Sequence, residues 1–273
     1  MSRKINHTVR GKLDIVKLRY DNFVVNKNRN VRIWLPFSYS EEAEPFNVIY
    51  CFDGQNLFDE KTAAFHKEWQ IDETIEKYSS SIRPSIVVGI DCSTNRDDEY
   101  TPSFSSLACG KVGYKAEDTI KFLSEFVMPY VEEHYNVSCV REGRSILGSS
   151  LGGLMALYGA IELRDLFSTV YAYSIGFVQY SVIGNIKENI VNKVAKIFTT
   201  EEYRNRFKLI LCTGGNDELE KAINKDVVLF YRYLIQYGYS KKLIILQKDM
   251  RFNHDECQWA FFFRQAYLKN NIN

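Results

Sequence analysis

Hydrophobic residues are arranged in two kinds of pattern along this chain. Short, nearly continuous apolar runs alternate with longer segments in which apolar residues recur every three or four positions. Continuous runs of this length are typical of strands buried on both faces of a parallel sheet. Six segments fit that description: Asn47–Phe52, Ser85–Ile90, Ser145–Gly148, Ser168–Ser174, Phe207–Thr213 and Lys242–Gln247.

Two earlier segments have a different character. Leu13–Tyr20 is apolar at nearly every second position, and Asn30–Pro36 is rich in residues that favour strands. A polar, turn-like cluster of asparagine and basic residues separates them. Alternation on either side of such a cluster predicts an antiparallel pair of strands, which brings the expected number of strands to eight.

Helical periodicity fills the gaps between the predicted strands. In the segment 116–135, apolar residues recur at a spacing that places them on one side of a helix. Strands that alternate with helices predict a doubly wound α/β fold, with a mostly parallel eight-stranded sheet and helices on both faces. The predicted helices are Glu68–Tyr78, Ala116–Tyr135, Leu151–Leu163, Glu218–Tyr237 and His254–Lys269.

Length and composition narrow the class of protein. The chain has 273 residues and a net charge of +1, which suits one domain over residues 1–273 and gives no field that would recruit nucleic acid or an anionic membrane. The six cysteines form no C-x-x-C pair, and the N-terminus lacks an apolar leader. We therefore expect a cytoplasmic protein that does not enter a membrane. The sequence predicts no oligomeric state.

One short motif suggests chemistry. Residues 148–152 read Gly-Ser-Ser-Leu-Gly and fit the pattern G-x-S-x-G, between an apolar strand and a helix rich in alanine and leucine. Such a turn lifts the serine to the carboxyl edge of the sheet at a helix N-terminus, and the glycines remove side chains that would clash. The motif predicts Ser150 as a nucleophile, with the backbone N–H of Leu151 available to an oxyanion. The alternative interpretation is a structural turn that requires small residues and takes no part in catalysis.

A serine hydroxyl needs a base, and the chain has four histidines: His7, His66, His134 and His254. His7 lies in the polar N-terminus, His66 in a polar loop, and His134 at the end of an amphipathic helix. His254 follows the last predicted strand, where a side chain can reach the edge that carries the nucleophile. We therefore predict His254 as the base.

A third side chain, an acid, should orient the imidazole and stabilise its cation. In this type of sheet it follows the seventh strand, between the serine and the histidine in chain order. Asp217 is the first acid there, and Glu218 is its neighbour. We predict Asp217, with Glu218 as the alternative. Both positions also suit a helix N-cap, a purely structural role.

Several further motifs, in the same order along residues 31–263, resemble the putative-esterase family of α/β hydrolases, which includes enterochelin esterases, esterase D-like enzymes and feruloyl esterases. They are D-G-Q-N-L-F-D at Asp53–Asp59, E-W-x-x-D-E at Glu68–Glu73, V-G-I-D at Val88–Asp91, D-E-Y-T-P at Asp98–Pro102 and H-x-E-x-x-W at His254–Trp259.

The resemblance implies the α/β-hydrolase fold and a serine esterase that requires no metal or organic cofactor. It also implies a second oxyanion donor after the third strand, the backbone N–H of Gln55, with Gly54 as the alternative. The chain departs from the family pattern after the sixth strand, where it reads Tyr-Ser-Ile-Gly-Phe at 173–177, and before Asp217, where it reads Gly-Gly-Asn.

The expected reaction is hydrolysis of a small-molecule carboxylic ester through an acyl-enzyme. Two alternatives remain: an acyltransferase on the same scaffold, and a binding protein that retains the fold without catalysis. The segment 175–206, with Tyr180, Phe198 and Tyr203, is a candidate cap or pocket wall; a surface helix packed on the sheet is the other interpretation.

Overall fold

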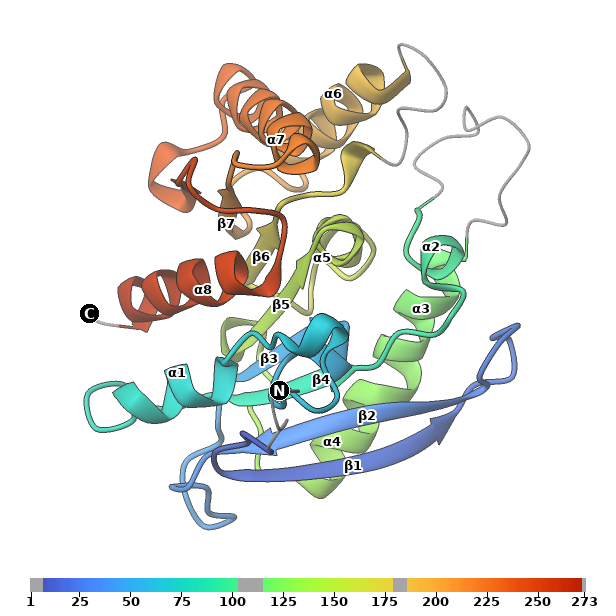
Figure 1. Cartoon of the computed structure of the whole chain (residues 1–273), viewed down its shortest axis with the longest axis vertical. Coiled ribbons are helices and arrows are strands. Elements are labelled where there is room, and N and C mark those ends of the chain that lie inside the picture. The colour runs from blue at the N-terminus through green and yellow to red at the C-terminus, as the bar shows by residue number, and fades with distance from the viewer. Residues whose placement is uncertain (1–6, 103–114, 179–185, 272–273) are drawn as a thin grey trace, which may run out of the picture.

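A computed structural model describes residues 7–102, 115–178 and 186–271, and its centre is one eight-stranded sheet (Figure 1). The strand order is β1-β2-β4-β3-β5-β6-β7-β8. The strands are β1 (Lys12–Arg19), β2 (Asn28–Leu35), β3 (Val48–Phe52), β4 (Ile86–Ile90), β5 (Arg144–Ser149), β6 (Thr169–Tyr173), β7 (Lys208–Thr213) and β8 (Ile244–Lys248).

The sheet is mostly parallel, as the apolar runs predicted. β1 pairs antiparallel with β2, and β2 antiparallel with β4. From β4 to β8 every neighbouring pair is parallel. All eight predicted strands are present within a few residues of their expected bounds, so the prediction of an α/β-hydrolase sheet is confirmed.

Helices cover both faces of the sheet (Figure 1). Successive residues of a strand point to opposite faces. Ile146 of β5 accordingly packs in the core on the side of α5, and Leu147 packs in a second core with residues of α1 and α8. The longer helices are α1 (Ile71–Tyr78), α3 (Ala116–Phe122), α4 (Met128–His134), α5 (Leu151–Glu162), α6 (Ile186–Thr199), α7 (Glu218–Gln236) and α8 (Glu256–Asn271).

The predicted helix at 116–135 contains one wider turn. A π-helical segment, Leu123–Val127, joins α3 to α4, and Pro129 follows in the first turn of α4. Because proline lacks an N–H and crowds the preceding turn, a local widening of the helix there has an identifiable cause.

The segment considered as a cap has a packing role where the structure describes it. Phe198 of α6 is fully buried, and its ring contacts those of Phe207 and Phe230. The Tyr203 hydroxyl donates a hydrogen bond to the carbonyl oxygen of Ile161. Tyr180 lies outside the described residues. The two described side chains therefore pack into the protein.

Candidate active site

Ser150 occupies the sharp turn between β5 and α5. Its backbone has φ 57° and ψ −124°, a region that non-glycine residues rarely adopt. The turn is so tight that a Cβ at Gly148 would lie 2.1 Å from the carbonyl oxygen of Gly152. The glycines of the motif are therefore required by contact, and the serine side chain is placed at the carboxyl edge of the sheet.

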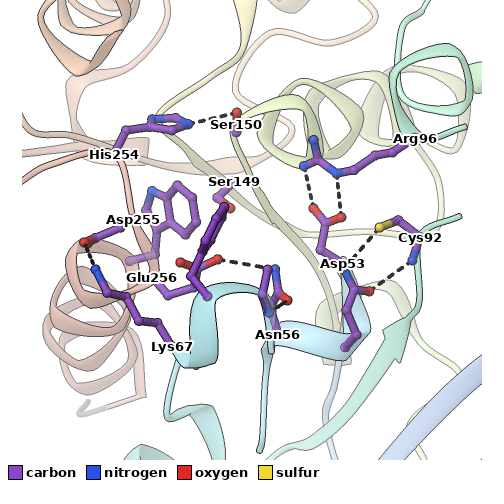
Figure 2. A pocket seen from close by; sticks show the side chains of 14 residues that line it. Asp53, Asn56, Lys67, Cys92, Arg96, Ser149, Ser150, His254, Asp255 and Glu256 are labelled. Atoms are coloured by element: carbon purple, nitrogen blue, oxygen red, sulfur yellow. Dashed lines mark hydrogen bonds and ion pairs between the residues drawn. The ribbon is translucent and has the colours of Figure 1, made fainter. Parts of the chain in front are cut away.

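His254 approaches from the loop between β8 and α8. Its Nε2 lies 3.0 Å from the Oγ of Ser150, within hydrogen-bond distance (Figure 2). The imidazole stands edge-on to Trp259, with ring centroids 5.2 Å apart. The structure thus brings together the predicted nucleophile and the predicted base, from positions 104 residues apart in sequence.

The side chain on the other nitrogen of the imidazole is Glu220. Its Oε2 lies 2.6 Å from Nδ1 of His254, and the Glu220 side chain is completely buried. The second oxygen, Oε1, accepts hydrogen bonds from four donors: the Gly214 N–H, the Ser174 and Thr213 hydroxyls and the Gln258 amide.

These donors decide the charge of Glu220. Burial alone would raise its pKa, but the hydrogen bonds from His254, Gly214 and Ser174 and the charge of His254 outweigh burial, so the pKa of Glu220 is lowered. An ionised carboxylate only accepts hydrogen bonds. His254 must therefore carry its proton on Nδ1, which leaves Nε2 free to accept the proton of the Ser150 hydroxyl.

Neither Asp217 nor Glu218, the acids predicted from the sequence, contacts the imidazole in this arrangement. Asp217 is the N-cap of α7: its Oδ1 accepts from the Glu220 N–H at 2.8 Å, and its Oδ2 accepts from the backbone N–H of His254 at 2.6 Å. The Glu218 side chain is 90% exposed and pairs with Lys221. The structure therefore places Glu220, two or three residues further along the chain than the predicted acids, against the imidazole.

The sequence did contain a signal for Glu220. It lies on the buried face of α7, in register with Ile223, Val227 and Phe230, where a charged residue is out of place. Residues three and four apart share a helix face, so a glutamate within that apolar stripe indicates a buried, paired carboxylate. Asp217 and Glu218 are the acids nearest the strand, and they begin α7 outside this buried stripe.

The other three histidines have surroundings that do not include Ser150. His7 pairs with Asp59, His66 is exposed in the 64–66 turn, and His134 stacks on Tyr130. Each interaction is with a surface or structural partner. The elimination that singled out His254 agrees with these positions.

The residues expected to supply the oxyanion donors lie around Ser150. Leu151 begins α5, directly after the nucleophile. Gln55 lines the same pocket as Ser150, and its side chain is anchored to Cys92, whose N–H donates to Gln55 Oε1 at 3.1 Å. Gly54 packs against the backbone of β4, where a Cβ would lie 2.6 Å from the carbonyl carbon of Gly89. Both loop residues are thus held in fixed positions.

A pocket with a volume of about 370 Å³ opens in front of Ser150 and His254 (Figure 2). Its lining is mixed: the Phe65 and Trp259 rings provide apolar surface, while ion pairs lie on two sides. Arg96 donates two hydrogen bonds of 2.7 Å to the carboxylate of Asp53, and Lys67 pairs with Asp255 at 2.8 Å. The pocket can therefore hold a small ester that has both apolar and polar groups.

The pocket also contains an acid, Glu256, whose pKa is shifted in the opposite direction from that of Glu220. Burial is the main cause that raises the pKa of Glu256 to about 7, and the neighbouring Asp255 and Asp53 add to the effect. Its Oε1 accepts a hydrogen bond of 3.3 Å from Asn56. Glu256 changes charge near neutral pH, beside the catalytic histidine candidate.

A group of carboxylates that could hold a metal ion, Glu68, Asp72 and Glu73, lies at the start of α1. None of the three lines the pocket described above. In the described ranges no helix combines the length and apolarity needed to cross a bilayer.

Comparisons with known proteins identify a related family and proteins of similar structure. The sequence profile of the putative esterase family matches residues 24–228. YbbA of Bacillus subtilis (strain 168), an uncharacterised protein, is 29% identical over 153 residues, which span 54% of this chain and 56% of YbbA. The match thus covers about half the length of that relative.

Two solved structures share the fold. A ferulic acid esterase superposes with a TM-score of 0.69 at 19% identity, covering 96% of this chain and 98% of that protein. The enterobactin esterase FES from Shigella flexneri, solved in the presence of enterobactin, superposes with a TM-score of 0.68 at 16% identity, covering 96% of this chain and 60% of that protein.

Proposed function

We propose that this chain, a member of the putative esterase family, is a carboxylic ester hydrolase that cleaves its substrate through a Ser150–His254–Glu220 triad and an acyl-enzyme. The observation that carries the proposal is the unbroken line of contacts from Ser150 Oγ to His254 Nε2, 3.0 Å, and from His254 Nδ1 to Glu220 Oε2, 2.6 Å. Nucleophile, base and orienting acid are within hydrogen-bond reach of one another.

The reaction has two halves. His254 Nε2 takes the proton of Ser150 as Oγ attacks the ester carbonyl, and Glu220 stabilises the imidazolium that forms. The tetrahedral intermediate collapses, the C–O bond to the alcohol breaks, and His254 gives its proton to the leaving oxygen. Water then attacks the acyl-enzyme with His254 as base, which releases the acid and restores the Ser150 hydroxyl.

The negative charge of each tetrahedral intermediate needs donors that are in place beforehand. We assign this role to the backbone N–H groups of Leu151 and Gln55, with Gly54 as the alternative to Gln55. Loss of one such donor typically costs about 3 kcal/mol of barrier. The anchoring of Gln55 to Cys92 supports the assignment, since it holds the loop rigid.

The pocket favours an ester with a small or aromatic acyl group. Its volume of about 370 Å³ and its Phe65 and Trp259 walls suit one ring or a short chain. Two structural neighbours are named as a ferulic acid esterase and an enterobactin esterase. A hydrolysis screen should therefore compare p-nitrophenyl acetate with aryl-acyl esters, a trilactone and long-chain acyl esters.

The decisive experiment removes the nucleophile and the base separately. Ser150→Ala and His254→Ala should each abolish nearly all hydrolysis of p-nitrophenyl acetate, about 10⁴-fold or more in kcat. A fluorophosphonate probe should label wild-type protein at Ser150, as shown by peptide mass mapping. A folded Ser150→Ala protein that still hydrolyses p-nitrophenyl acetate at the wild-type rate would contradict the proposal.

The same experiment separates the two other functions. A folded wild-type protein that neither reacts with the probe nor hydrolyses any ester of the screen would indicate a binding protein that keeps the fold. If added alcohol captures the acyl group faster than water does, the enzyme is an acyltransferase. Product analysis with and without an alcohol acceptor distinguishes these outcomes.

A further inference from the structure

Three acids at the start of α1 form a compact group behind the active-site loop. Glu68 precedes α1, and Asp72 and Glu73 lie in its first turn. One carboxylate oxygen of each lies within 4.8 Å of the others. The group is buried: Glu68 is 6% exposed, Asp72 is 0% exposed and Glu73 is half-buried.

Each acid has an oxygen that is buried without a hydrogen-bond partner in the described part of the protein. These atoms are Glu68 Oε2, Asp72 Oδ1 and Glu73 Oε2. The other oxygen of Asp72 is engaged, since it accepts from the backbone N–H of Arg10 at 2.6 Å. Buried polar atoms are almost always paired, and each exception requires an explanation. Here three exceptions fall within one group, in side chains of which two are more than nine-tenths buried.

Other acids surround the group. Burial chiefly raises the pKa of Asp72 to about 9, and the neighbouring Glu73 adds to the effect. Burial also raises the pKa of Glu68 to about 7, against a hydrogen bond from Thr8 and with the charges of Glu73, Glu60 and Asp59 adding to it.

Basic side chains are close by on the neighbouring elements. Lys67 pairs with Asp255 of the loop before α8, and His7 pairs with Asp59. Of the three acids, Glu68 lines a cavity of about 410 Å³, whose other polar lining residues include Glu60, His66, Lys67, Gln70 and Arg264.

We propose that Glu68, Asp72 and Glu73 bind a hard divalent cation of the Ca²⁺ type. Carboxylate oxygens are the ligands that such ions prefer, at about 2.3–2.6 Å from Ca²⁺. Two oxygens on opposite sides of one ion can therefore be about 5 Å apart, which accommodates the 4.8 Å limit of this group. Water molecules can complete the coordination.

The cation would connect three segments of the chain. Glu68 ends the loop that carries Gln55 and Phe65, Asp72 and Glu73 begin α1, and Arg10 brings the start of β1 to Asp72. Binding should stabilise the fold and fix the active-site loop. It takes no part in the chemistry, so the site can be tested apart from the triad.

The test uses the full chain with Ca²⁺ as the probe. In wild-type protein at pH 8, Ca²⁺ at a hundredfold excess over its Kd should raise Tm by roughly 5 °C or more over the value in EDTA. Tb³⁺ bound in place of Ca²⁺ should show emission sensitised by Trp69, the neighbour of Glu68, and Ca²⁺ should displace it.

Asp72→Asn is the discriminating variant, with Glu41→Gln as an exposed acidic control. In EDTA at pH 8, Asp72→Asn should be at least as stable as wild type, because it removes a buried acid with few donors. It should lose the Ca²⁺-dependent rise in Tm and the Tb³⁺ signal, and the control should keep both. A wild-type protein without any Ca²⁺-dependent shift, or an equal shift in Asp72→Asn, would overturn the proposal.

Discussion

Glu220 and Asp72 are both completely buried carboxylates, yet they have opposite charge behaviour. Glu220 accepts hydrogen bonds on both oxygens, and its pKa lies below the ordinary value. Asp72 has one backbone donor and an unpartnered oxygen, and its pKa rises to about 9. The same burial thus accompanies an anion in one region and a protonated acid in the other.

The difference lies in the groups that surround each carboxylate. Around Glu220, donors converge from β7, from the turn after β6 and from α8, and a histidine supplies a positive charge when it takes a proton. Around Asp72 the nearest charged groups are other acids. Donors and countercharge, not burial, decide whether a buried acid is ionised. A proposed triad needs the first kind of environment; a cation site can use the second.

The largest expected effect separates the two acids by activity. Glu220→Gln should lower kcat for p-nitrophenyl acetate about 10³–10⁴-fold, because a neutral amide does not stabilise the imidazolium and can present the wrong partner to Nδ1. In EDTA, where no cation is bound in either protein, Asp72→Asn should change kcat less than about twofold, since Asp72 lies outside the pocket. Comparable losses in the two variants would erase the functional contrast.

The next effect separates them by pH dependence of stability. A carboxyl whose folded pKa is raised stabilises the folded state below its unfolded pKa, and that stabilisation is lost as pH rises through the folded pKa. Asp72, with a pKa of about 9, and Glu68, with a pKa of about 7, should therefore make wild type less stable as pH rises.

Denaturant unfolding in EDTA should show this loss. Between pH 6 and pH 8 the free energy of unfolding should fall by about 4 kcal/mol in wild type, because each group loses about 1.4 kcal/mol per pH unit until its folded pKa is reached. In Asp72→Asn the fall should be smaller. Glu220, whose pKa is lowered, contributes in the opposite sense and only at acidic pH: its stabilisation is lost as pH falls through its folded pKa. An unchanged pH slope in Asp72→Asn would contradict the assignment of a raised pKa.

A smaller effect tests the donors of Glu220. Ser174 donates to Glu220 at 2.8 Å and accepts from Gln258 and Trp259. Removing its hydroxyl by Ser174→Ala should lower kcat roughly tenfold, the equivalent of one hydrogen bond to a charged group. Ser174 is a positioning residue, so the acidic limb of the pH–rate profile should also move. An unaltered pH profile together with lower Tm would indicate a structural role alone.

The smallest effects concern the two acids predicted from the sequence. Asp217→Ala removes the cap of α7 and the contact with the His254 backbone, so it should cost about 1 kcal/mol of stability with a modest loss of kcat. Glu218→Gln is an exposed substitution, so it should change the free energy of unfolding and the activation free energy by no more than about 0.5 kcal/mol each. Thermal unfolding and steady-state kinetics on the two variants measure this order; a reversed order would restore Glu218 as a candidate.

The sequence predicted the parts of this molecule that depend on local pattern. The six apolar runs became parallel strands, and the Gly148–Gly152 motif became the turn at Ser150, because steric rules and burial act over a few residues. His254 could be identified because so few histidines compete with it. These features cover the fold and two members of the candidate triad.

The acid could not be identified from position alone. Asp217 and Glu220 are one helical turn apart, and which of them faces His254 depends on how α7 rotates against β7 and on the path of the loop after β8. Asp217 is used by two backbone N–H groups, which only the folded loop reveals. The Glu68 group was likewise hidden inside a family motif, since its unpartnered oxygens are visible only in three dimensions.

The central claim is that Glu220 acts through His254 on Ser150. The most direct measurement is kcat for p-nitrophenyl acetate in Glu220→Gln, His254→Ala and the double variant, with folding checked by circular dichroism. Residues that act as one unit are not additive, so the double variant should be no slower than His254→Ala alone. If the two losses multiply in the double variant, Glu220 acts independently of His254 and the proposed triad is wrong.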